Sequence, residues 1–257
     1  MTAAKTVRNT RVVNAGNSQF IDVMMCGDTH IGDSFRDPRY MQFIQKWVNA
    51  EKNRYVILTG DLFNAAIMGS KSDIYEEEFT LNGAMAVATE WLSSFSNKVV
   101  ANIDGNHDQR VDRSVGIDPV EHVSREAGCL YDGMEAYVSL SVGTSFYDIY
   151  VTHGVGGGRT QGGKINNLMR LREIVVADCY VQGHQHDPVI KPGRIQRISQ
   201  NHRHVEMVDQ LFIVTPGGLK RGGYAVAKAY APTGWGIPVV RFFGSKKCME
   251  PRLIDIV

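Results

Sequence analysis

The sequence predicts an α/β fold in which two mixed β-sheets pack face to face and helices cover their outer faces, an α/β/β/α sandwich. Two observations predict it. In the first half of the chain, apolar runs of strand length alternate with amphipathic runs of helix length, which is the pattern of βαβ units with parallel strands. In the second half, strand-like segments dominate and one helix interrupts them, so the sheets are expected to be mixed.

The first half contains apolar runs that we expect to be strands at 20–27, 55–60 and 98–105. Continuous apolar runs are typical of strands that are covered on both faces. The helices expected in this half span 38–53, 76–95 and 119–128. The first helix opens with a proline, which suits position N1. The second opens with three glutamates, which would suit the positive end of the helix dipole.

The second half contains strand-like segments at 136–142, 145–154, 178–184, 204–218 and 237–244. A single helical segment, 164–176, interrupts them. No composition shift, repeat or long linker divides the chain. We therefore expect one domain at 19–257, preceded by a short polar lead at 1–18.

The length and composition are those of an ordinary globular protein, with 257 residues, of which 43% are hydrophobic and 21% charged. The net charge of +1 gives no basic field of the kind that a non-specific nucleic-acid coat protein carries. It does not exclude a nuclease, because bound metal ions can make a site locally positive. The substrate must therefore be inferred from the site rather than from the charge balance.

The cysteines and the N-terminus bear on the cellular compartment. The four cysteines lie far apart with no CxxC pair, which favours buried reduced thiols over disulfides or a zinc site. The N-terminal lead has no apolar core typical of a secretory signal. No apolar stretch approaches the ~20 residues that a membrane helix needs. We expect a cytoplasmic protein with no membrane contact.

Five short polar clusters follow apolar strands, each where its strand ends. They are "GDTH" (27–30), "GDLF" (60–63), "GNHD" (105–108), "VTHG" (151–154) and "GHQH" (183–186). In open α/β sheets this edge is where ligands bind, so the clusters are expected to meet at one place. A single "GD" is weak evidence, since surface turns often contain one. Five clusters in this order at strand ends are very hard to obtain by chance.

The clusters offer seven candidate metal ligands, which are Asp28, His30, Asp61, Asn106, His153, His184 and His186. Seven donors are too many for one four-coordinate zinc and suit two cations that share a bridging group. Carboxylate oxygen with imidazole nitrogen favours Mn²⁺, with Fe, Zn²⁺ or Ni²⁺ as alternatives, over Mg²⁺ or Ca²⁺. The glycines before the ligands are expected to permit sharp turns.

Two divalent cations roughly 3.5–4 Å apart are the usual apparatus of phosphoryl-ester hydrolysis. They bind the phosphate oxygens, generate a hydroxide nucleophile and offset the developing charge. His107, directly after Asn106, would then point outward and protonate the leaving alkoxide.

This ordered set resembles the calcineurin-like metallophosphoesterase superfamily, whose pattern is D-x-H, GD, GNH[DE], H and GHxH. The resemblance spans residues 27 to about 186. It implies that one metal binds Asp28, His30, Asp61 and His186. It implies that the other binds Asp61, Asn106, His153 and His184, with Asp61 bridging and His107 as general acid.

The wider context bears on the substrate. "GDLF" followed by "GNHD" is more similar to the repair nucleases and phosphodiesterases of this superfamily than to its protein phosphatases, which carry "GDxVDRG" and "GNHE". The strings "GDLFNAAIMGSKSD", "VTHGVGGGRTQGGKINNL" and "VTPGGLKRGGYA" are similar to members encoded by phages and prophages, which implies the host cytoplasm. The resemblance implies a phosphoester substrate, possibly DNA or a nucleotide. A phosphomonoesterase, including a phosphoprotein phosphatase, and a non-catalytic binding module remain alternatives.

One departure concerns Asn64, which stands where many members of the superfamily have an Asp that hydrogen-bonds the catalytic His. An amide oxygen can still orient an imidazole N–H, but it cannot stabilise imidazolium by full charge, so the proton donor should be more acidic. Arg110 is a candidate clamp for a substrate phosphate, with a surface salt bridge as the alternative. The glycine-rich segment 154–167, with Arg159 and Lys164, is a candidate phosphate cradle, with a plain surface loop as the alternative.

Overall fold

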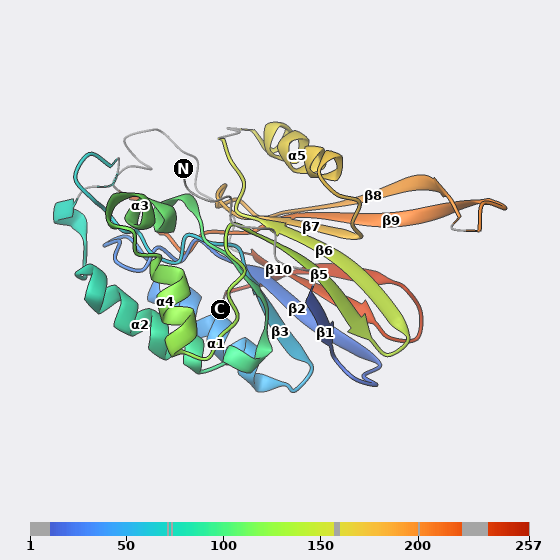
Figure 1. Cartoon of the computed structure of the whole chain (residues 1–257), viewed down its shortest axis with the longest axis horizontal. Coiled ribbons are helices and arrows are strands. Elements are labelled where there is room, and N and C mark those ends of the chain that lie inside the picture. Colours follow the sequence, from blue (N-terminus) through green and yellow to red (C-terminus); the bar gives the residue numbers. More distant parts are fainter. Residues whose placement is uncertain are drawn as a thin grey trace.

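Two β-sheets form the centre of the fold (Figure 1). The structure is a computed structural model that describes residues 11–70, 72, 74–156, 160–199, 201–222 and 236–256. The six-stranded sheet has the order β1-β5-β6-β7-β9-β8, and the five-stranded sheet has the order β11-β10-β2-β3-β4. Both sheets contain parallel and antiparallel pairs. The predicted sandwich of two mixed sheets with helices outside is therefore confirmed.

The strands are β1 (Arg11–Asn14), β2 (Phe20–Cys26), β3 (Arg54–Leu58), β4 (Val99–Asn102), β5 (Glu135–Val142), β6 (Ser145–Thr152), β7 (Cys179–Gln182), β8 (Val189–Ile198), β9 (Val205–Val214), β10 (Gly236–Phe243) and β11 (Met249–Asp255). The α-helices are α1 (Pro38–Ala50), α2 (Leu81–Ser93), α3 (Asn106–Val115), α4 (Pro119–Glu126) and α5 (Gln161–Met169). Short 3₁₀ turns occupy Ile74–Glu76, Ser96–Lys98 and Arg170–Glu173.

The period of two along β2 separates the two main apolar layers. Met24 and Cys26 face the helices, whereas Val23 and Met25 face the other sheet. All four side chains are fully buried. The strand is apolar on both faces because both faces are covered, as its continuous apolar run predicts. Helices α1, α2 and α4 cover the five-stranded sheet, and α5 packs on β7 and β9 of the other sheet (Figure 1).

Four expectations about secondary structure differ from the structure. Helix α2 begins at Leu81 with Thr80 as its N-cap, so the glutamates at 76–78 precede the helix and do not occupy its first turn. Asn106 does not simply follow a strand but is the first residue of helix α3. Strands β8 and β11 were not expected, because polar and charged side chains interrupt their apolar pattern. Part of the polar lead, Arg11–Asn14, forms β1 and pairs in parallel with β5.

A buried carboxylate anchors the edge of the five-stranded sheet. Asp22 on β2 accepts two hydrogen bonds of 2.9 Å from Arg241 on β10 and one of 2.9 Å from Arg252 on β11. Burial opposes ionisation of Asp22, but the two guanidinium groups outweigh burial and hold its pKa below the ordinary aspartate value. Because the folded-state pKa is the lower one, this carboxylate stabilises the fold above the unfolded-state pKa.

We expect Asp22→Asn to lower the free energy of unfolding at pH 7 by about 2 kcal/mol, the scale of hydrogen bonds to a charged group. The difference from wild type should stay constant down to about pH 4 and shrink below it, as Asp22 itself becomes protonated. Urea unfolding at pH 7 and pH 3 measures this. Asp209→Asn is the control, since its pair with Arg194 is exposed and should contribute little. A penalty that does not change with pH would contradict the linkage.

Two observations bear on the expectations about the cellular compartment. All four cysteines are free, and Cys26 and Cys179 are buried. Within the described part of the chain, no helix is both long enough and apolar enough to cross a bilayer.

Candidate metal centre

The seven predicted ligands lie just beyond the carboxyl ends of five strands, six of them in loops and Asn106 at the start of helix α3. Asp28 and His30 follow β2, Asp61 follows β3, and Asn106 follows β4. From the other sheet, His153 follows β6, and the pair His184 and His186 follows β7. Strands β2, β3 and β4 run parallel to one another, and so do β6 and β7, so their carboxyl ends lie at a common edge of each sheet. The structure thus brings together side chains that are up to 158 residues apart.

One group of donors forms around Asp28, with His30 and His186. His186 Nε2 lies 3.0 Å from Asp28 Oδ1 and 3.1 Å from His30 Nε2. The Asp28 side chain is completely buried, and the His184 amide donates to both of its oxygens at 3.1 Å. His30 Nδ1 is buried and has no hydrogen-bond partner among the described residues. Two imidazole nitrogens and a carboxylate therefore converge on one point.

A second group forms around Asp61, with His153 and His184. His153 Nε2 lies 3.2 Å from Asp61 Oδ2 and 3.1 Å from Asn106 Oδ1. His153 Nδ1 lies 2.7 Å from the carbonyl oxygen of Thr59, which fixes its proton there when the ring is neutral. Three lone-pair atoms then face one another. Such an arrangement requires a proton or a cation between them, and the donor set fits a divalent ion.

The carboxylate of Asp61 faces both groups through one oxygen. Its Oδ1 accepts from the His107 amide at 2.8 Å, at the start of helix α3. Its Oδ2 lies 3.2 Å from His153 Nε2, 3.8 Å from His30 Nε2 and 4.0 Å from His107 Nε2. Asp61 is thus also the carboxylate of a third group, with His30 and His107. This geometry is what a bridging carboxylate requires.

Electrostatics of the metal-free protein reflect this crowding. Burial opposes ionisation of Asp61, but His153, His107 and His30 outweigh it and lower the Asp61 pKa. Burial opposes protonation of His153, but Asp61 outweighs it and raises the His153 pKa to about 10. Burial, together with His107, lowers the pKa of His30. In the metal-free protein, a proton on His153 therefore compensates the Asp61 charge.

The backbone at the ligands is strained. Asp28, His30, Asp61, His184 and His186 all have positive φ, between 45° and 70°. Such conformations are uncommon for non-glycine residues and cost of order 1–3 kcal/mol each. Strain repeated at five predicted ligands is of the kind that clusters at functional sites.

The glycines before the ligands serve a different purpose from the predicted one. Four glycines directly precede predicted ligands, at positions 27, 60, 105 and 183. Only Gly60 has a positive φ, at 88°, so the sharp turns lie mainly at the predicted ligands themselves. The glycines instead allow neighbouring loops to touch. A Cβ atom on Gly105 would lie 2.0 Å from Asp61 Oδ1, and one on Gly27 would lie 2.1 Å from Thr59 Oγ1.

His107 lies beside the ligand groups at the start of α3. Its Nδ1 lies 2.9 Å from the carbonyl oxygen of Asn64, and its ring centroid is 4.6 Å from that of His30. Burial is the main cause that lowers the pKa of His107, and Arg110 adds to it, whereas Asp61 opposes it. With Nδ1 bonded to a carbonyl, Nε2 is the nitrogen that faces the site.

The contact between Asn64 and His107 corrects the sequence-based expectation. The main-chain carbonyl of Asn64, not its side-chain amide, accepts from the imidazole. The side chain points elsewhere, because Asn64 Nδ2 donates to Glu77 Oε1 at 2.7 Å and Ser72 Oγ lies 3.4 Å from Asn64 Oδ1. An aspartate at this position would lack the N–H donor that makes this contact with Glu77.

The two cationic side chains predicted near the site are engaged in the protein. Arg110 Nη1 donates to Ser72 Oγ at 3.2 Å and lies 3.5 Å from the carbonyl oxygen of Asn64. Lys164 is buried and pairs with Asp187 at 2.8 Å. Lys164 thus links α5 to the loop after His186, and this pairing does not support a phosphate cradle. Arg159, the other cation of the predicted cradle, lies outside the described residues.

Asp108 is a site residue that sequence reasoning did not assign. Its buried carboxylate accepts from the main-chain amides of Gly105 at 2.8 Å, Phe63 at 2.9 Å and Leu62 at 3.2 Å. It therefore ties the start of α3 to the loop that carries Asp61. An acidic residue three positions after the helix cap is a capping-box signal, so the string "GNHD" could have revealed this role.

Comparison with known proteins shows the family of this chain. A family model described as calcineurin-like phosphoesterase matches residues 21–205. A comparison with curated proteins gave no match. Among solved structures, the chain is similar to wild-type Vps29 complexed with Zn²⁺ from Entamoeba histolytica, at 12% identity and a TM-score of 0.42, over 92% of this chain and 100% of that one.

Two further solved structures are similar at the same level. NAD nucleotidase (NadN) from Haemophilus influenzae has 13% identity and a TM-score of 0.41, over 92% of this chain and 50% of that one. A protein serine/threonine phosphatase from Saccharomyces cerevisiae has 9% identity and a TM-score of 0.42, over 96% of this chain and 84% of that one. Since the family model covers most of the chain, this protein belongs to the calcineurin-like phosphoesterase family.

Proposed function

We propose that this chain is a dinuclear metal-dependent phosphodiesterase that acts on nucleic acid or nucleotides. The family to which it belongs consists of metal-dependent phosphoesterases. The observation that carries the proposal is the position of Asp61. Its Oδ2 faces His30, which belongs to the group around Asp28, and His153, which belongs to the second group. One central carboxylate with six further side-chain donors around it is the ligand supply that two cations need.

The assignment of ligands follows the two groups. One cation would be held by Asp28, His30, Asp61 and His186, and the other by Asp61, Asn106, His153 and His184. The buried charge of Asp28 and Asp61 favours divalent cations there, since an uncompensated buried carboxylate is costly. Mixed oxygen and nitrogen donors favour Mn²⁺, with Fe, Zn²⁺ or Ni²⁺ as alternatives. Bound ions would supply Lewis-acid polarisation of the phosphate and an activated water.

The chain itself supplies the proton for the leaving group. When protonated, His107 donates through Nδ1 to the carbonyl of Asn64 and presents Nε2–H to the site. Burial keeps its pKa below the ordinary histidine value, so the proton is more readily given up to a leaving alkoxide. Asp61 fixes the His107 main chain through the bond from its amide, which holds the imidazole beside the donor groups.

Charge favours a diester over a monoester. A monoester brings a second negative charge, which a site normally meets with an additional cation. Lys164 is already paired with Asp187, whereas Arg110 donates to the neutral Ser72 hydroxyl, a contact that leaves its charge in place. A diester carries one negative charge and requires no such cation. This agrees with the nuclease-like sequence context "GDLF" and "GNHD".

We expect the Mn²⁺-reconstituted protein to hydrolyse bis-p-nitrophenyl phosphate faster than p-nitrophenyl phosphate, for the reason just given. A panel of single- and double-stranded DNA, RNA and cyclic nucleotides, assayed with Mn²⁺ and with EDTA, would identify the natural class. A preference for the monoester would instead indicate a phosphomonoesterase. No hydrolysis of any ester, with metals bound, would indicate a binding module and contradict the proposal.

A further inference from the structure

We propose that Glu77 is a positioning residue for His107, acting through the loop at 64–66. This inference rests on the proposed function, because it assigns Glu77 a part in proton transfer to the leaving group. Glu77 lies between the 3₁₀ turn at Ile74–Glu76 and helix α2, and its contacts are made in the half-buried space between two loops of the site.

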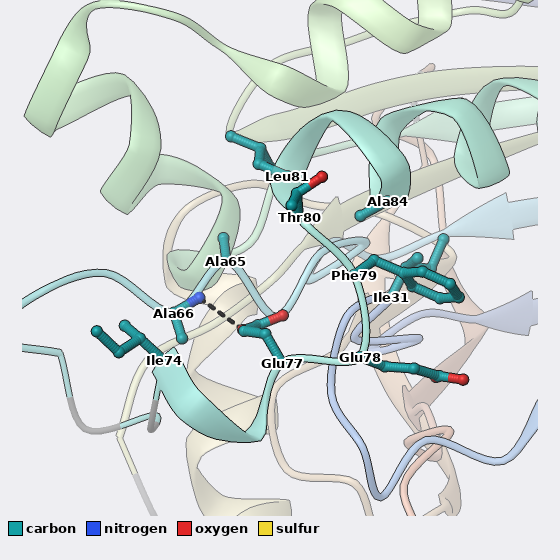
Figure 2. Close-up of a pocket in the computed structure, with 10 residues that line it drawn as sticks. All are labelled: Ile31, Ala65, Ala66, Ile74, Glu77, Glu78, Phe79, Thr80, Leu81 and Ala84. Atoms are coloured by element: carbon teal, nitrogen blue, oxygen red, sulfur yellow. Dashed lines mark hydrogen bonds between the residues drawn. The ribbon is translucent and has the colours of Figure 1, made fainter.

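The first contact is with the loop at 64–66. Glu77 Oε1 accepts from Asn64 Nδ2 at 2.7 Å. The same oxygen accepts from the Ala66 amide at 2.8 Å (Figure 2). One oxygen thus holds a side chain and a main-chain amide that lie two residues apart. Between them, Ala65 has a φ of 47°, a strained conformation for a residue with a side chain. A strained turn persists only when contacts from the surrounding structure stabilise it, and Glu77 makes such contacts.

The second contact is with the loop that follows His30. The Glu78 amide donates to the Gly32 carbonyl at 2.6 Å, and the Ser34 amide donates to the Glu76 carbonyl at 3.2 Å. A Cβ atom on Gly32 would lie 2.2 Å from Glu77 Oε2, so the carboxylate lies directly against this backbone. The segment around Glu77 therefore joins the loop of a metal ligand to the loop at 64–66.

The loop at 64–66 in turn orients His107. The Asn64 carbonyl lies 2.9 Å from His107 Nδ1 and is the contact that fixes the direction of the ring. Moving this carbonyl would rotate Nε2 away from the leaving oxygen. A misplacement of about 1 Å can cost about 10² in rate even when the change is remote from the reacting atoms.

Among the described residues, Glu77 is the acceptor that both donors share. It lies on the wall of an open cavity of ≈ 410 Å³, whose other lining residues are mainly apolar, including Ile31, Ala65 and Phe79 (Figure 2). Removing the carboxylate would leave the Asn64 side-chain amide and the Ala66 N–H without this acceptor. The loop would keep the bond from the Asn64 main-chain amide to the Ile31 carbonyl but lose the contact that spans its strained residue, Ala65.

The test uses three variants of the metal-loaded full chain. Glu77→Ala removes the acceptor, whereas Glu77→Gln keeps an oxygen that accepts from the same two donors. Glu78→Ala is the matched control, since that side chain reaches outward to Arg36. Each is assayed on bis-p-nitrophenyl phosphate, which has a good leaving group, and on a dinucleotide, whose leaving group is an alkoxide. Metal content is measured for each variant.

We expect Glu77→Ala to lower kcat on the dinucleotide by about tenfold to 10²-fold, with normal metal content and a much smaller loss on the nitrophenyl ester. Glu77→Gln should restore the dinucleotide rate, and Glu78→Ala should leave it unchanged. In a His107→Asn background, Glu77→Ala should cause no further loss, because the group it positions is already gone.

The opposite results separate the two proposals. Equal losses on both esters, loss of metal, or a full additional loss in the His107→Asn background would show that Glu77 acts by stabilising the site, and would overturn the inference. A wild-type protein that hydrolyses both esters but does not respond to Glu77→Ala would overturn this inference alone. A wild-type protein with no esterase activity would overturn the proposed function, and the inference with it.

Discussion

Asp61→Asn is expected to weaken both metals at once and to lower diester hydrolysis by roughly 10³-fold or more, beyond the loss from removing a single electrostatic contact. The reason is that the two oxygens of the Asp61 carboxylate make different contacts. Oδ1 is engaged by the His107 amide, and Oδ2 faces His153 and His30. An asparagine that keeps the first contact must place its NH₂ group where the cations would lie. Two N–H donors then replace a negative oxygen.

Elemental analysis after reconstitution and dialysis measures this effect. The wild type should hold close to two transition-metal ions, and Asp61→Asn should hold fewer than one. Asp33→Asn is the matched control, because Asp33 lies in the neighbouring loop and belongs to none of the three donor groups. Thermal unfolding in EDTA checks that the variant folds. If Asp61→Asn lost one metal and kept the other at normal affinity, Asp61 would not bridge.

His107→Asn is expected to lower the turnover of esters with poor leaving groups by about 10²–10⁴-fold, the usual contribution of a positioned general acid. An ester that releases p-nitrophenolate needs little protonation and should lose much less. Metal content should stay near normal, since the asparagine removes the acid and leaves all seven proposed ligands in place. The ratio of the two rate losses is therefore the decisive quantity.

The structure also allows an alternative role for His107, as a metal ligand. His107 Nε2 lies 4.0 Å from Asp61 Oδ2, and His107 belongs to one of the three donor groups that could hold a cation. If His107 were a ligand, His107→Asn would release metal and slow both esters equally. His122→Asn, an exposed histidine on α4, controls for the loss of a histidine elsewhere. Either result assigns the residue.

The sequence alone predicted the sandwich, most of its buried strands and the set of residues that gather at the site. Buried strands such as β2 and β3 are readable because both faces are apolar, and their carboxyl ends meet by the geometry of parallel sheets. Strands β8 and β11 were not readable. They lie at the outer edges of the two sheets, where exposed polar side chains break the apolar pattern.

Several features of the site were decided only by the tertiary structure. The sequence placed Asn64 near His107, but which atom of Asn64 contacts the ring depended on Glu77, which competes for the amide. The sequence marked the glycines as turns, whereas they allow loops from different strands to touch. The residue types and their order determine which strands form and which side chains gather at their ends. Rotamers and loop approach depend on neighbours distant in the chain, so hydrogen-bond partners at the site are fixed only when the two sheets pack.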